Sequence, residues 1–301
     1  MRIILPPDQR PARLTVGVVG AGRVGAVLGA ALARAGHQVA AVAAVSEDSR
    51  KRAEELLPGA DVLPVDEVAA IAELLVLAVP DDALRGLVVG LANSRVVGSG
   101  ALVVHTSGAH GIEVLEPLTE WGALPLALHP VMTFTGTDVD LQRLESTCFG
   151  VTTTEPLRPV AEALVIEMGA EPVWIAEDQR IAYHAGLAFS ANNLVTLVTE
   201  GSDLLRRSGV DHPQRMLGPL LGAALDNALR HGDRGLTGPV ARGDAGTVAA
   251  HLSAIRSAAP EAVAAYVEMS RLTAARALAA GLISTAQAGE LLDVLSGEEQ
   301  P

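Results

Sequence analysis

The sequence has few aromatic residues and a single cysteine. Phenylalanine, tyrosine and tryptophan make up 2% of the 301 residues, while 49% are hydrophobic, so alanine, valine and leucine must fill the core. This composition suits helices and strands that are buried between helical layers. The lone Cys148 excludes a disulfide within the chain and favours a reducing compartment. A chain of this length is long enough for two domains, each with its own core.

Basic residues are scarce as well. There are 22 lysines and arginines against 35 aspartates and glutamates, which gives a formal net charge of −13. An acidic surface repels nucleic acid and anionic membranes, so we expect neither as a partner. The eight histidines are scattered and form no tight cluster with cysteine or carboxylates, so no metal site is predicted.

Long apolar runs are also missing. No uncharged run approaches the ~20 residues of a membrane span. The apolar run at the N-terminus is too short for a secretory signal and is interrupted by Pro6 and Pro7. We therefore expect a soluble, cytoplasmic protein.

Short apolar runs alternate with helical segments in the first half of the chain. The expected strands, which are apolar on both faces, cover residues 14–19, 38–45, 74–79, 101–106, 124–129, 148–153 and 172–176. The expected helices begin near Val24, Ser49, Asp66, Asp81 and Ile112, and another runs from Pro156 to Met168. This alternation predicts an α/β fold with a doubly wound, mostly parallel sheet.

The pattern changes after about Ala176. The remaining chain contains no convincing strand, and its expected helices cover residues 178–208, 212–231, 244–257, 260–280 and 284–296. A strand-rich half followed by an all-helical half predicts two domains. We place a dinucleotide-binding domain at residues 1–176 and a helical domain for substrate binding and dimerisation at residues 177–301.

A glycine-rich loop joins the first expected strand to the first helix. Its sequence is GAGRVG, which is formed by Gly20, Ala21, Gly22, Arg23, Val24 and Gly25. In this strand–loop–helix context the motif is typical of dinucleotide binding. The first glycine permits a tight turn, the second lets a pyrophosphate approach the backbone, and the third allows close helix packing. The alternative is a tight turn without a ligand.

The residues after the second expected strand bear on the choice of dinucleotide. An NAD site usually has an acidic residue there, but Val45 and Ser46 occupy the position. Hydroxyl and guanidinium groups follow instead, and these suit a 2′-phosphate. They belong to a run that contains Ser46, Ser49, Arg50, Lys51 and Arg52. The sequence favours NADP(H) over NAD(H), although the acidic residues 47 and 48 intrude and the basic residues 50–52 are also compatible with an exposed helix turn.

Three further strands end in distinctive residues. Ligands of doubly wound sheets lie beyond the carboxyl ends of the strands. We expect Val79, Pro80 and His105 to contact the cofactor, and Ser107 and His129 to contact the substrate. The alternatives are that Ser107 caps the next helix and that His129 bonds a buried loop carbonyl.

The long expected helix at residues 178–208 carries polar residues in an apolar sequence. His184, Ala188 and Asn192 fall on one stripe at 100° per residue, whereas Asn193 points away from His184. A helix this apolar is expected to be buried, and unpaired polar groups are costly to bury. We therefore expect substrate to pair with His184 and Asn192. An imidazole near neutral pKa suits general acid work.

An irregular stretch, RGLTGPVARGDAG, interrupts the helical half. Its glycines and proline form a loop in which Asp244 is expected to cap the next helix. Arg242 then stands at a helix start, where its guanidinium can bind a substrate carboxylate or phosphate. The alternative is that Arg242 contacts Asp244 and only shapes the turn.

Two resemblances to known families follow from these motifs. Dehydrogenases of the ketopantoate reductase and hydroxyisobutyrate dehydrogenase group carry Lys-x-x-x-Asn in the helix after the nucleotide domain, and ketopantoate reductases add a further asparagine. Here these positions are His184, Ala188 and Asn192. The motifs GAGRVG, HTSGAHG, LHPVMTF, YHAGLAFSANNL and LTGPVARGD resemble more closely a bacterial family with a Rossmann-like NADP-binding domain and a helical domain of unknown function. Its members are often labelled deazaflavin- or NADP-dependent oxidoreductases.

The resemblances and the residues together predict an NADP(H)-dependent oxidoreductase. We expect it to transfer a hydride to a small carbonyl or imine substrate, similar to a 2-keto acid, bound between the two domains. The alternatives are a non-catalytic dinucleotide sensor or scaffold, and an enzyme that exchanges hydride between NADP and a deazaflavin. The later helices are apolar on more than one side, so we also expect a homodimer through the helical domain. The alternative is a compact monomeric bundle that hides the same faces.

Overall fold

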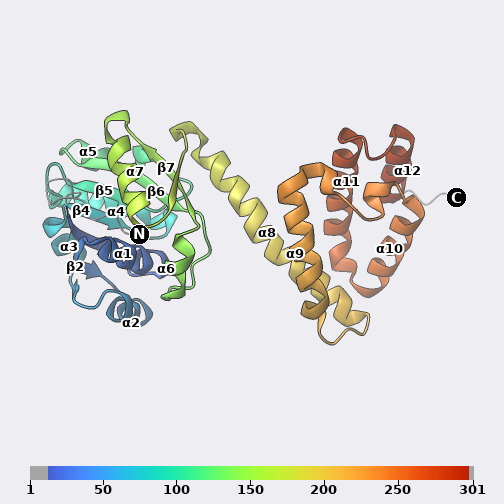
Figure 1. Ribbon diagram of the computed structural model, residues 1–301, viewed down its shortest axis with the longest axis horizontal. Helices are drawn as coiled ribbons and strands as arrows, with labels where there is room; N and C mark the ends of the chain where they lie inside the picture. Colours follow the sequence, from blue (N-terminus) through green and yellow to red (C-terminus); the bar gives the residue numbers. More distant parts are fainter. Residues whose placement is uncertain (1–12, 298–301) are drawn as a thin grey trace, which may run out of the picture. The chain divides into compact units, whose positions relative to one another are not determined.

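The computed structural model describes residues 13–297 of the chain (Figure 1). The N-terminal run on which the signal-peptide prediction rests lies outside these residues. Contacts between Cα atoms divide the chain into two units, Met1–Phe189 and Ser190–Pro301. This division falls within a long helix, after the predicted domain boundary at residues 176 and 177.

The first unit is built on one sheet of eight strands in the order β3-β2-β1-β4-β5-β6-β7-β8. The strands are β1 Thr15–Val19, β2 Gln38–Ala43, β3 Asp61–Val62, β4 Leu74–Leu77, β5 Leu102–His105, β6 Leu124–Pro130, β7 Cys148–Thr153 and β8 Glu171–Trp174. Neighbouring strands are parallel except for β6 and β7, which are antiparallel. The first six follow the order of doubly wound dinucleotide-binding sheets. The predicted fold class is confirmed.

Helices cover both faces of the sheet, because residues along each strand alternate between two cores. In β1, Val16 and Val18 belong to one core and Val19 to the other. The helices of this unit are α1 Arg23–Ala35, α2 Glu47–Leu56, α3 Val65–Ile71, α4 Asp81–Ser94, α5 Glu116–Thr119, α6 Val139–Leu144, α7 Arg158–Glu167 and the start of α8 Arg180–Arg207. Helices α1, α2, α6 and α7 pack on the first core, and α3, α4 and α5 on the second.

A few elements differ from the expected ones. The strand β3 has two residues and α6 has six, which is too short for a periodic pattern to reveal them. The helix expected from Ile112 begins as a 3-10 turn over Ile112–Leu115 and continues as the short α5. Strands β2 and β4 end two residues before the expected positions, because the chain leaves the sheet there to form the loops at its carboxyl edge.

The second unit is helical throughout its described residues. It contains the end of α8, α9 Pro213–His231, α10 Ala245–Ala258, α11 Val263–Ala279 and α12 Thr285–Ser296. Its core is formed by apolar residues of α10, α11 and α12, among them Val248, Leu252 and Leu291. Asp244 caps α10 by accepting the backbone N–H of Thr247 at 3.0 Å, as the sequence predicts.

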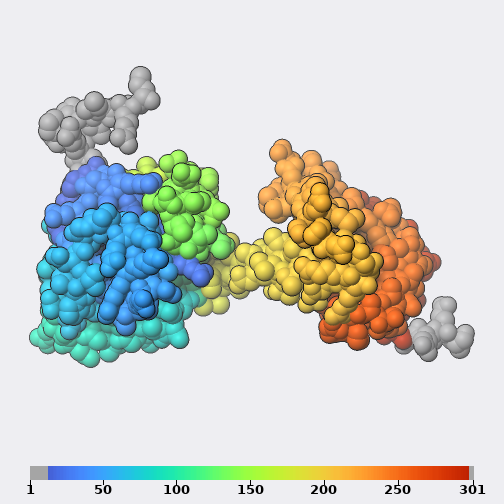
Figure 2. Space-filling view, turned by 90° about the horizontal axis from the view of Figure 1, so that it is seen from below, coloured from blue at the N-terminus to red at the C-terminus, as the bar shows by residue number. Residues whose placement is uncertain are grey.

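Helices α8 and α9 are more exposed than their sequence predicts. Arg180 is the only buried residue of α8 and Pro213 the only buried residue of α9. Apolar side chains of both helices lie open to solvent in the single chain, whose surface is shown in Figure 2, with these helices in yellow and orange. Val195 is 67% exposed and Leu220 is 63% exposed. The expectation of a buried helix is therefore wrong for the single chain, in which most side chains of α8 and α9 are exposed.

None of the helices within residues 13–297 is long and apolar enough to cross a membrane.

Candidate functional site

The glycine loop between β1 and α1 has the shape that phosphate binding requires. Gly20 has φ +96°, a left-handed conformation that favours glycine, and a Cβ there would lie 2.5 Å from the Ala78 carbonyl oxygen. A Cβ on Gly25 would overlap the Gly20 carbonyl oxygen and lie 2.8 Å from the Ala78 Cβ. A Cβ on Gly22, by contrast, would have no described atom within 4 Å. Gly22 is thus open to a ligand at the N-terminus of α1.

Hydroxyl and guanidinium groups gather at the start of α2. The Ser46 hydroxyl caps α2 by accepting the backbone N–H of Ser49, and the Ser49 hydroxyl donates to the Ser46 carbonyl at 2.7 Å. Arg50 donates from Nε to the Ala44 carbonyl. Arg52 reaches back to the glycine loop, where its Nη1 donates to the Ala21 carbonyl at 3.0 Å. The two serines thus order the helix start, and each hydroxyl oxygen has a lone pair left for a further hydrogen bond.

A loop after β6 lies against Arg52 and Arg23. A Cβ on Gly136 would lie 2.8 Å from Arg52 Nε and 3.0 Å from Arg23 Cγ. This loop is held by Asp140, whose buried carboxylate accepts the backbone N–H groups of Thr135 and Gly136 at 2.7 Å each. The hydrogen bonds outweigh the effect of burial and lower the pKa of Asp140. The loop therefore places glycine backbone, with no side chain to obstruct it, beside Arg23 and Arg52.

The pair Val79 and Pro80 follows β4 as the sequence predicts. Pro80 stands at the N-cap of α4, and Val79 is partly buried against the second core. Ala78, directly before them, contacts the glycine loop, since its carbonyl and Cβ are the atoms that crowd Gly20 and Gly25. The end of β4 therefore lies beside the loop expected to bind the cofactor.

His105 at the end of β5 is completely buried and has internal partners. Its Nε2 lies 2.8 Å from the Gly111 carbonyl, and its Nδ1 accepts the backbone N–H of Ser107 at 3.2 Å. This pairing fixes the Nε2–H tautomer and shapes the loop at residues 107–111. Burial lowers the pKa of His105 to about 4, with a smaller contribution from the charge of Arg180.

The low pKa of His105 predicts a loss of stability in acid. The unfolded chain takes up a proton near the ordinary pKa of 6.5, whereas the folded chain takes it up only near 4. The free energy of unfolding should therefore fall as the pH drops from about 6.5 towards 4, by about 3 kcal/mol from this residue alone. Urea unfolding across this pH range should show a shallower pH dependence for His105→Asn. An unchanged slope would contradict the assignment, and His212→Asn, at an exposed histidine, is the control.

Ser107 is almost fully buried and partly engaged. Its Oγ accepts the backbone N–H of His110 at 3.1 Å, a bond within the loop, and the N-cap of the following 3-10 turn is Gly111, so Ser107 does not cap the next helix. The loop that carries it is also tied to the start of α8, because the Glu177 carboxylate accepts the N–H groups of Ile112 and Glu113 at 2.8 and 3.1 Å. Glu177 leaves room only for glycine at position 111, where a Cβ would overlap the carboxylate.

Two histidines meet above Gly108. His129, at the end of β6, and His184, in the second turn of α8, pack edge to face with ring centroids 5.9 Å apart. A Cβ on Gly108 would lie 2.9 Å from His129 Nε2 and 2.6 Å from His184 Cδ2. Both rings are half-buried. The structure thus brings His129, His184 and the Ser107–Gly108 backbone together at the carboxyl edge of the sheet.

Tyr183 lies behind His129. Its hydroxyl is 2.8 Å from His129 Nδ1, and the two rings are edge to face at 5.6 Å. Burial raises the pKa of Tyr183, so the phenol keeps its proton. Burial also lowers the pKa of His129 to about 4, with smaller effects from His184 and Arg180. His129 is therefore neutral at physiological pH.

Arg180 is a buried cation beneath these rings. Its guanidinium donates to the Ala127 and Gly150 carbonyls and to the Thr152 hydroxyl, and it is 1% exposed. The Nη1 atom has no hydrogen-bond partner among the described residues. Burial lowers the pKa of Arg180 to about 10, so the group stays charged at neutral pH. Because its hydrogen-bond partners are two carbonyls and a hydroxyl, which carry no charge, Arg180 adds a net positive charge to the site.

Asn192 and Arg242 belong to the second unit. Asn192 is exposed on α8, and Arg242 is exposed at the end of the 3-10 turn Val240–Arg242. No salt bridge to Arg242 is present among the residues that the structure describes, although its charge helps to lower the pKa of Asp244. The Arg242 carbonyl accepts a hydrogen bond from Gln287 at 3.2 Å.

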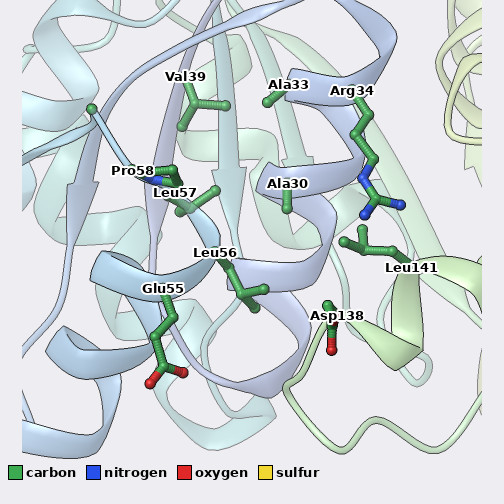
Figure 3. A pocket seen from close by; sticks show the side chains of 11 residues that line it. Ala30, Ala33, Arg34, Val39, Glu55, Leu56, Leu57, Pro58, Asp138 and Leu141 are labelled. Carbon is green, nitrogen blue, oxygen red and sulfur yellow. The ribbon is translucent and has the colours of Figure 1, made fainter.

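A cavity in the first unit is separate from these residues. It has a volume of about 540 Å³ and lies between α1, α2 and α6 (Figure 3). Arg34, Leu57 and Leu141 are among its lining residues. Arg34 stands in the last turn of α1, at the end opposite the glycine loop. This cavity is therefore not part of the candidate site.

Three residues of the site region are absent from the sequence-based prediction or not assigned a role there: Tyr183, Arg180 and Glu177. Arg180 and Tyr183 precede His184 in the same helix, and helical spacing alone does not show which neighbour faces the sheet. Arg52 is part of the basic run after β2, but its contact with Ala21 depends on tertiary packing. An arginine at the start of an apolar helix is the one signal in the sequence that could have pointed to a buried charge.

Comparison with known proteins agrees with this architecture. Residues 5–130 match the model of a Rossmann-like domain, and residues 147–273 match the model of a domain of unknown function, DUF2520. These two matches confirm the predicted resemblance to proteins with a Rossmann-like domain followed by a helical domain of unknown function. No protein of curated function matches the sequence.

Solved structures share the fold over most of the chain. A candidate NADP oxidoreductase from Bacteroides fragilis has a TM-score of 0.72 at 22% identity, covering 87% of this chain and 98% of its own. A protein from Thermotoga maritima has a TM-score of 0.67 at 22% identity, covering 89% and 100%. An imine reductase from Myxococcus stipitatus, solved with NADP+, has a TM-score of 0.64 at 16% identity, covering 92% and 99%. At these identities the likeness shows the fold alone.

Proposed function

We propose that this Rossmann-like, DUF2520-containing protein is an NADP(H)-dependent oxidoreductase that transfers a hydride to a small carbonyl or imine substrate. The observation that carries the proposal is the position of two histidines. His129 ends a strand at the sheet edge that bears the open glycine loop, and His184 packs on it. An NADP oxidoreductase and an NADP+-bound imine reductase among the structural neighbours support it at the level of fold.

The residues around the glycine loop fit a dinucleotide. The space at Gly22 and the N-terminus of α1 suit a pyrophosphate, and Val79 and Pro80, which follow β4 beside this loop, would contact the ribose. Arg50 and Arg52 would hold a 2′-phosphate, together with the serine hydroxyls at the start of α2. NADPH, when bound, supplies the hydride.

The chain's own groups would handle the proton and orient the substrate. His184 is the proposed general acid, which protonates the developing alkoxide or amine. Ser107 and His129 hold the acceptor atom in place beside Gly108. Asn192 and Arg242 are proposed to orient the substrate and to anchor an acidic group, in keeping with a 2-keto acid. His105 supports the loop from within the core.

Removing the basic groups after β2 should weaken NADPH binding selectively. The Arg50→Ala/Arg52→Ala double variant should raise the Kd for NADPH about 10²- to 10⁴-fold, because each of the two lost charge-assisted hydrogen bonds contributes roughly 1.5 to 3 kcal/mol. The Kd for NADH, measured by fluorescence titration, should change little. Lys51→Ala, at the exposed residue between them, is the control. Equal losses for both cofactors would contradict NADP selectivity.

The proposed activity is tested by stopped-flow oxidation of NADPH. The purified protein is mixed with NADPH and with 2-keto acids, imines or an oxidised deazaflavin in turn. The proposal expects oxidation with members of the first or second class. Tight NADPH binding without oxidation by any of them would favour a dinucleotide sensor, and oxidation by the deazaflavin alone would favour exchange between the two cofactors.

We also propose a homodimer, which would cover the apolar residues of α8 and α9. Two variants, Val195→Lys and Leu220→Lys, each place a lysine at one of these exposed positions. Each variant should sediment as a monomer, whereas the wild type should sediment as a dimer. Desolvating a charge in an apolar interface is unfavourable, whereas an exposed lysine is not. Ile166→Lys, at a 55% exposed residue of α7, is the control and should remain dimeric. A monomeric wild type would contradict the proposal.

A further inference from the structure

The pairing of Tyr183 with His129 determines which nitrogen of His129 carries the proton. Burial raises the pKa of the phenol and lowers that of the imidazole to about 4, so a protonated hydroxyl faces a neutral ring at neutral pH. The hydroxyl lies 2.8 Å from Nδ1. Among the described residues, His129 Nδ1 is the acceptor within hydrogen-bond distance of this hydroxyl. The phenol therefore donates to Nδ1, and the imidazole proton lies on Nε2.

The opposite edge of the His129 ring, which carries Nε2, lies at the candidate site. His129 Nε2 is the atom that a Cβ on Gly108 would meet at 2.9 Å, next to the His184 ring. It has no hydrogen-bond partner among residues 13–297 and is not among their buried unsatisfied atoms. The Nε2–H group is thus a free donor beside Gly108, and glycine at that position keeps a side chain away from it.

Burial, and to a smaller extent the charges around it, keep the His129 ring neutral by lowering its pKa. His184 and Arg180 both act to lower its pKa, and Asp81 acts in the opposite direction. The Arg180 guanidinium is fixed by its bonds to strand carbonyls and stays positive. The Glu177 carboxylate is occupied by two backbone N–H groups of the loop before α5. No aspartate or glutamate among the described residues pairs with His129.

We infer that Tyr183 is a positioning residue that holds His129 as a neutral Nε2–H donor to an acceptor atom of the substrate. The tautomer is a property of the chain alone, and the role toward substrate rests on the proposed function. A donor of this kind bonds an oxygen or nitrogen lone pair, and it stabilises negative charge that develops there. A protonated iminium offers N–H instead of a lone pair, and it is repelled by the nearby Arg180. We therefore narrow the proposed substrates to those with a carbonyl oxygen, in preference to iminium cations.

The tautomer is measured by NMR on the full chain with ¹⁵N-labelled histidine, the His129 signals being identified by their loss in His129→Asn. The wild type is expected to show one neutral Nε2–H tautomer from pH 8 to pH 5. Tyr183→Phe should show both tautomers. A wild-type Nδ1–H tautomer, a ring that is protonated at pH 6, or a Tyr183→Phe spectrum identical to the wild type would each overturn the inference. These results do not depend on whether the protein reduces any substrate.

A second Tyr–His pair supplies a matched control. Tyr266 and His251 have their hydroxyl and Nδ1 3.0 Å apart, in the second unit. Tyr266→Phe removes the same hydroxyl and should change the His251 signals alone. If the protein proves to be a reductase, Tyr183→Phe should lower kcat for a 2-keto acid about tenfold and leave the Kd for NADPH unchanged, while Tyr266→Phe changes neither. Faster turnover of a cyclic iminium than of a 2-keto acid of equal size would contradict the substrate preference and leave the tautomer result standing.

Discussion

Gly25→Ala is expected to abolish NADPH binding and to destabilise the first unit. The new methyl group would overlap the Gly20 carbonyl oxygen and press on the Ala78 Cβ, and the obstructing oxygen belongs to backbone that cannot rotate away. Overpacking of this kind typically costs ~1 to 3 kcal/mol and more where backbone must move. Thermal unfolding should show a lower Tm, and fluorescence titration should show no saturable NADPH binding.

Gly22→Ala tests ligand binding at the same loop without the steric overlap that Gly25→Ala creates. No described atom lies within 4 Å of the position its methyl group would take, so the fold should be as stable as the wild type. The methyl group would nevertheless occupy the space expected for the pyrophosphate, so NADPH affinity should fall at least tenfold. A Gly22→Ala protein that binds NADPH as tightly as the wild type would contradict phosphate binding at this loop.

His184→Ala is expected to lower the rate constant of hydride transfer by about 10² to 10⁴, the usual contribution of a general acid. The ring lies against Gly108 and His129, whereas the phosphates are expected at the glycine loop, so the Kd for NADPH should stay nearly unchanged. Single-turnover oxidation of NADPH measures the first quantity and fluorescence titration the second. His184→Lys, which restores the residue of the resembling dehydrogenases, should retain more activity than His184→Ala.

The control for this variant is His212→Ala, at an exposed histidine before α9. It should leave both the rate and the affinity unchanged. A joint loss of NADPH binding and turnover in His184→Ala, together with a lower Tm, would assign His184 a structural role and would contradict its role as a general acid.

The sequence predicts the fold well because each element follows its own local pattern. The strands of the sheet are runs apolar on both faces, and α10 and α12 begin at Asp244 and Ser284, where a side chain caps the helix. The glycine loop forms where the sequence predicts it, since Gly20 and Gly25 each meet a steric demand of the fold, while Gly22 leaves open space. Elements of two to six residues, such as β3 and α6, lack enough sequence for any pattern.

The candidate site is only partly predictable. Ser107 and His129 end neighbouring parallel strands, which the sheet order brings together, and His184 is recognisable as a polar residue in an apolar helix. The burial of His105 and the pairing of Tyr183 with His129 depend on side-chain packing between distant segments. The carbonyl bonds of Arg180 depend on the antiparallel pairing of β6 with β7, which no local pattern reveals.

The exposure of α8 and α9 shows a different limit. The apolar sequence of α8 predicts burial, yet side chains such as Phe189 and Val195 are more than half exposed in the single chain. Periodicity indicates that a face is apolar, but it does not say which molecule covers the face. The proposed homodimer assigns that role to a second copy.

A crystal structure of the NADPH complex tests the central claim most directly. The account predicts the pyrophosphate on the backbone N–H groups at the start of α1, beside Gly22, and the nicotinamide ring in contact with His129 and His184. A dinucleotide bound elsewhere with the loop at Gly20–Gly25 empty, or a His184 side chain turned away from the nicotinamide, would contradict the account.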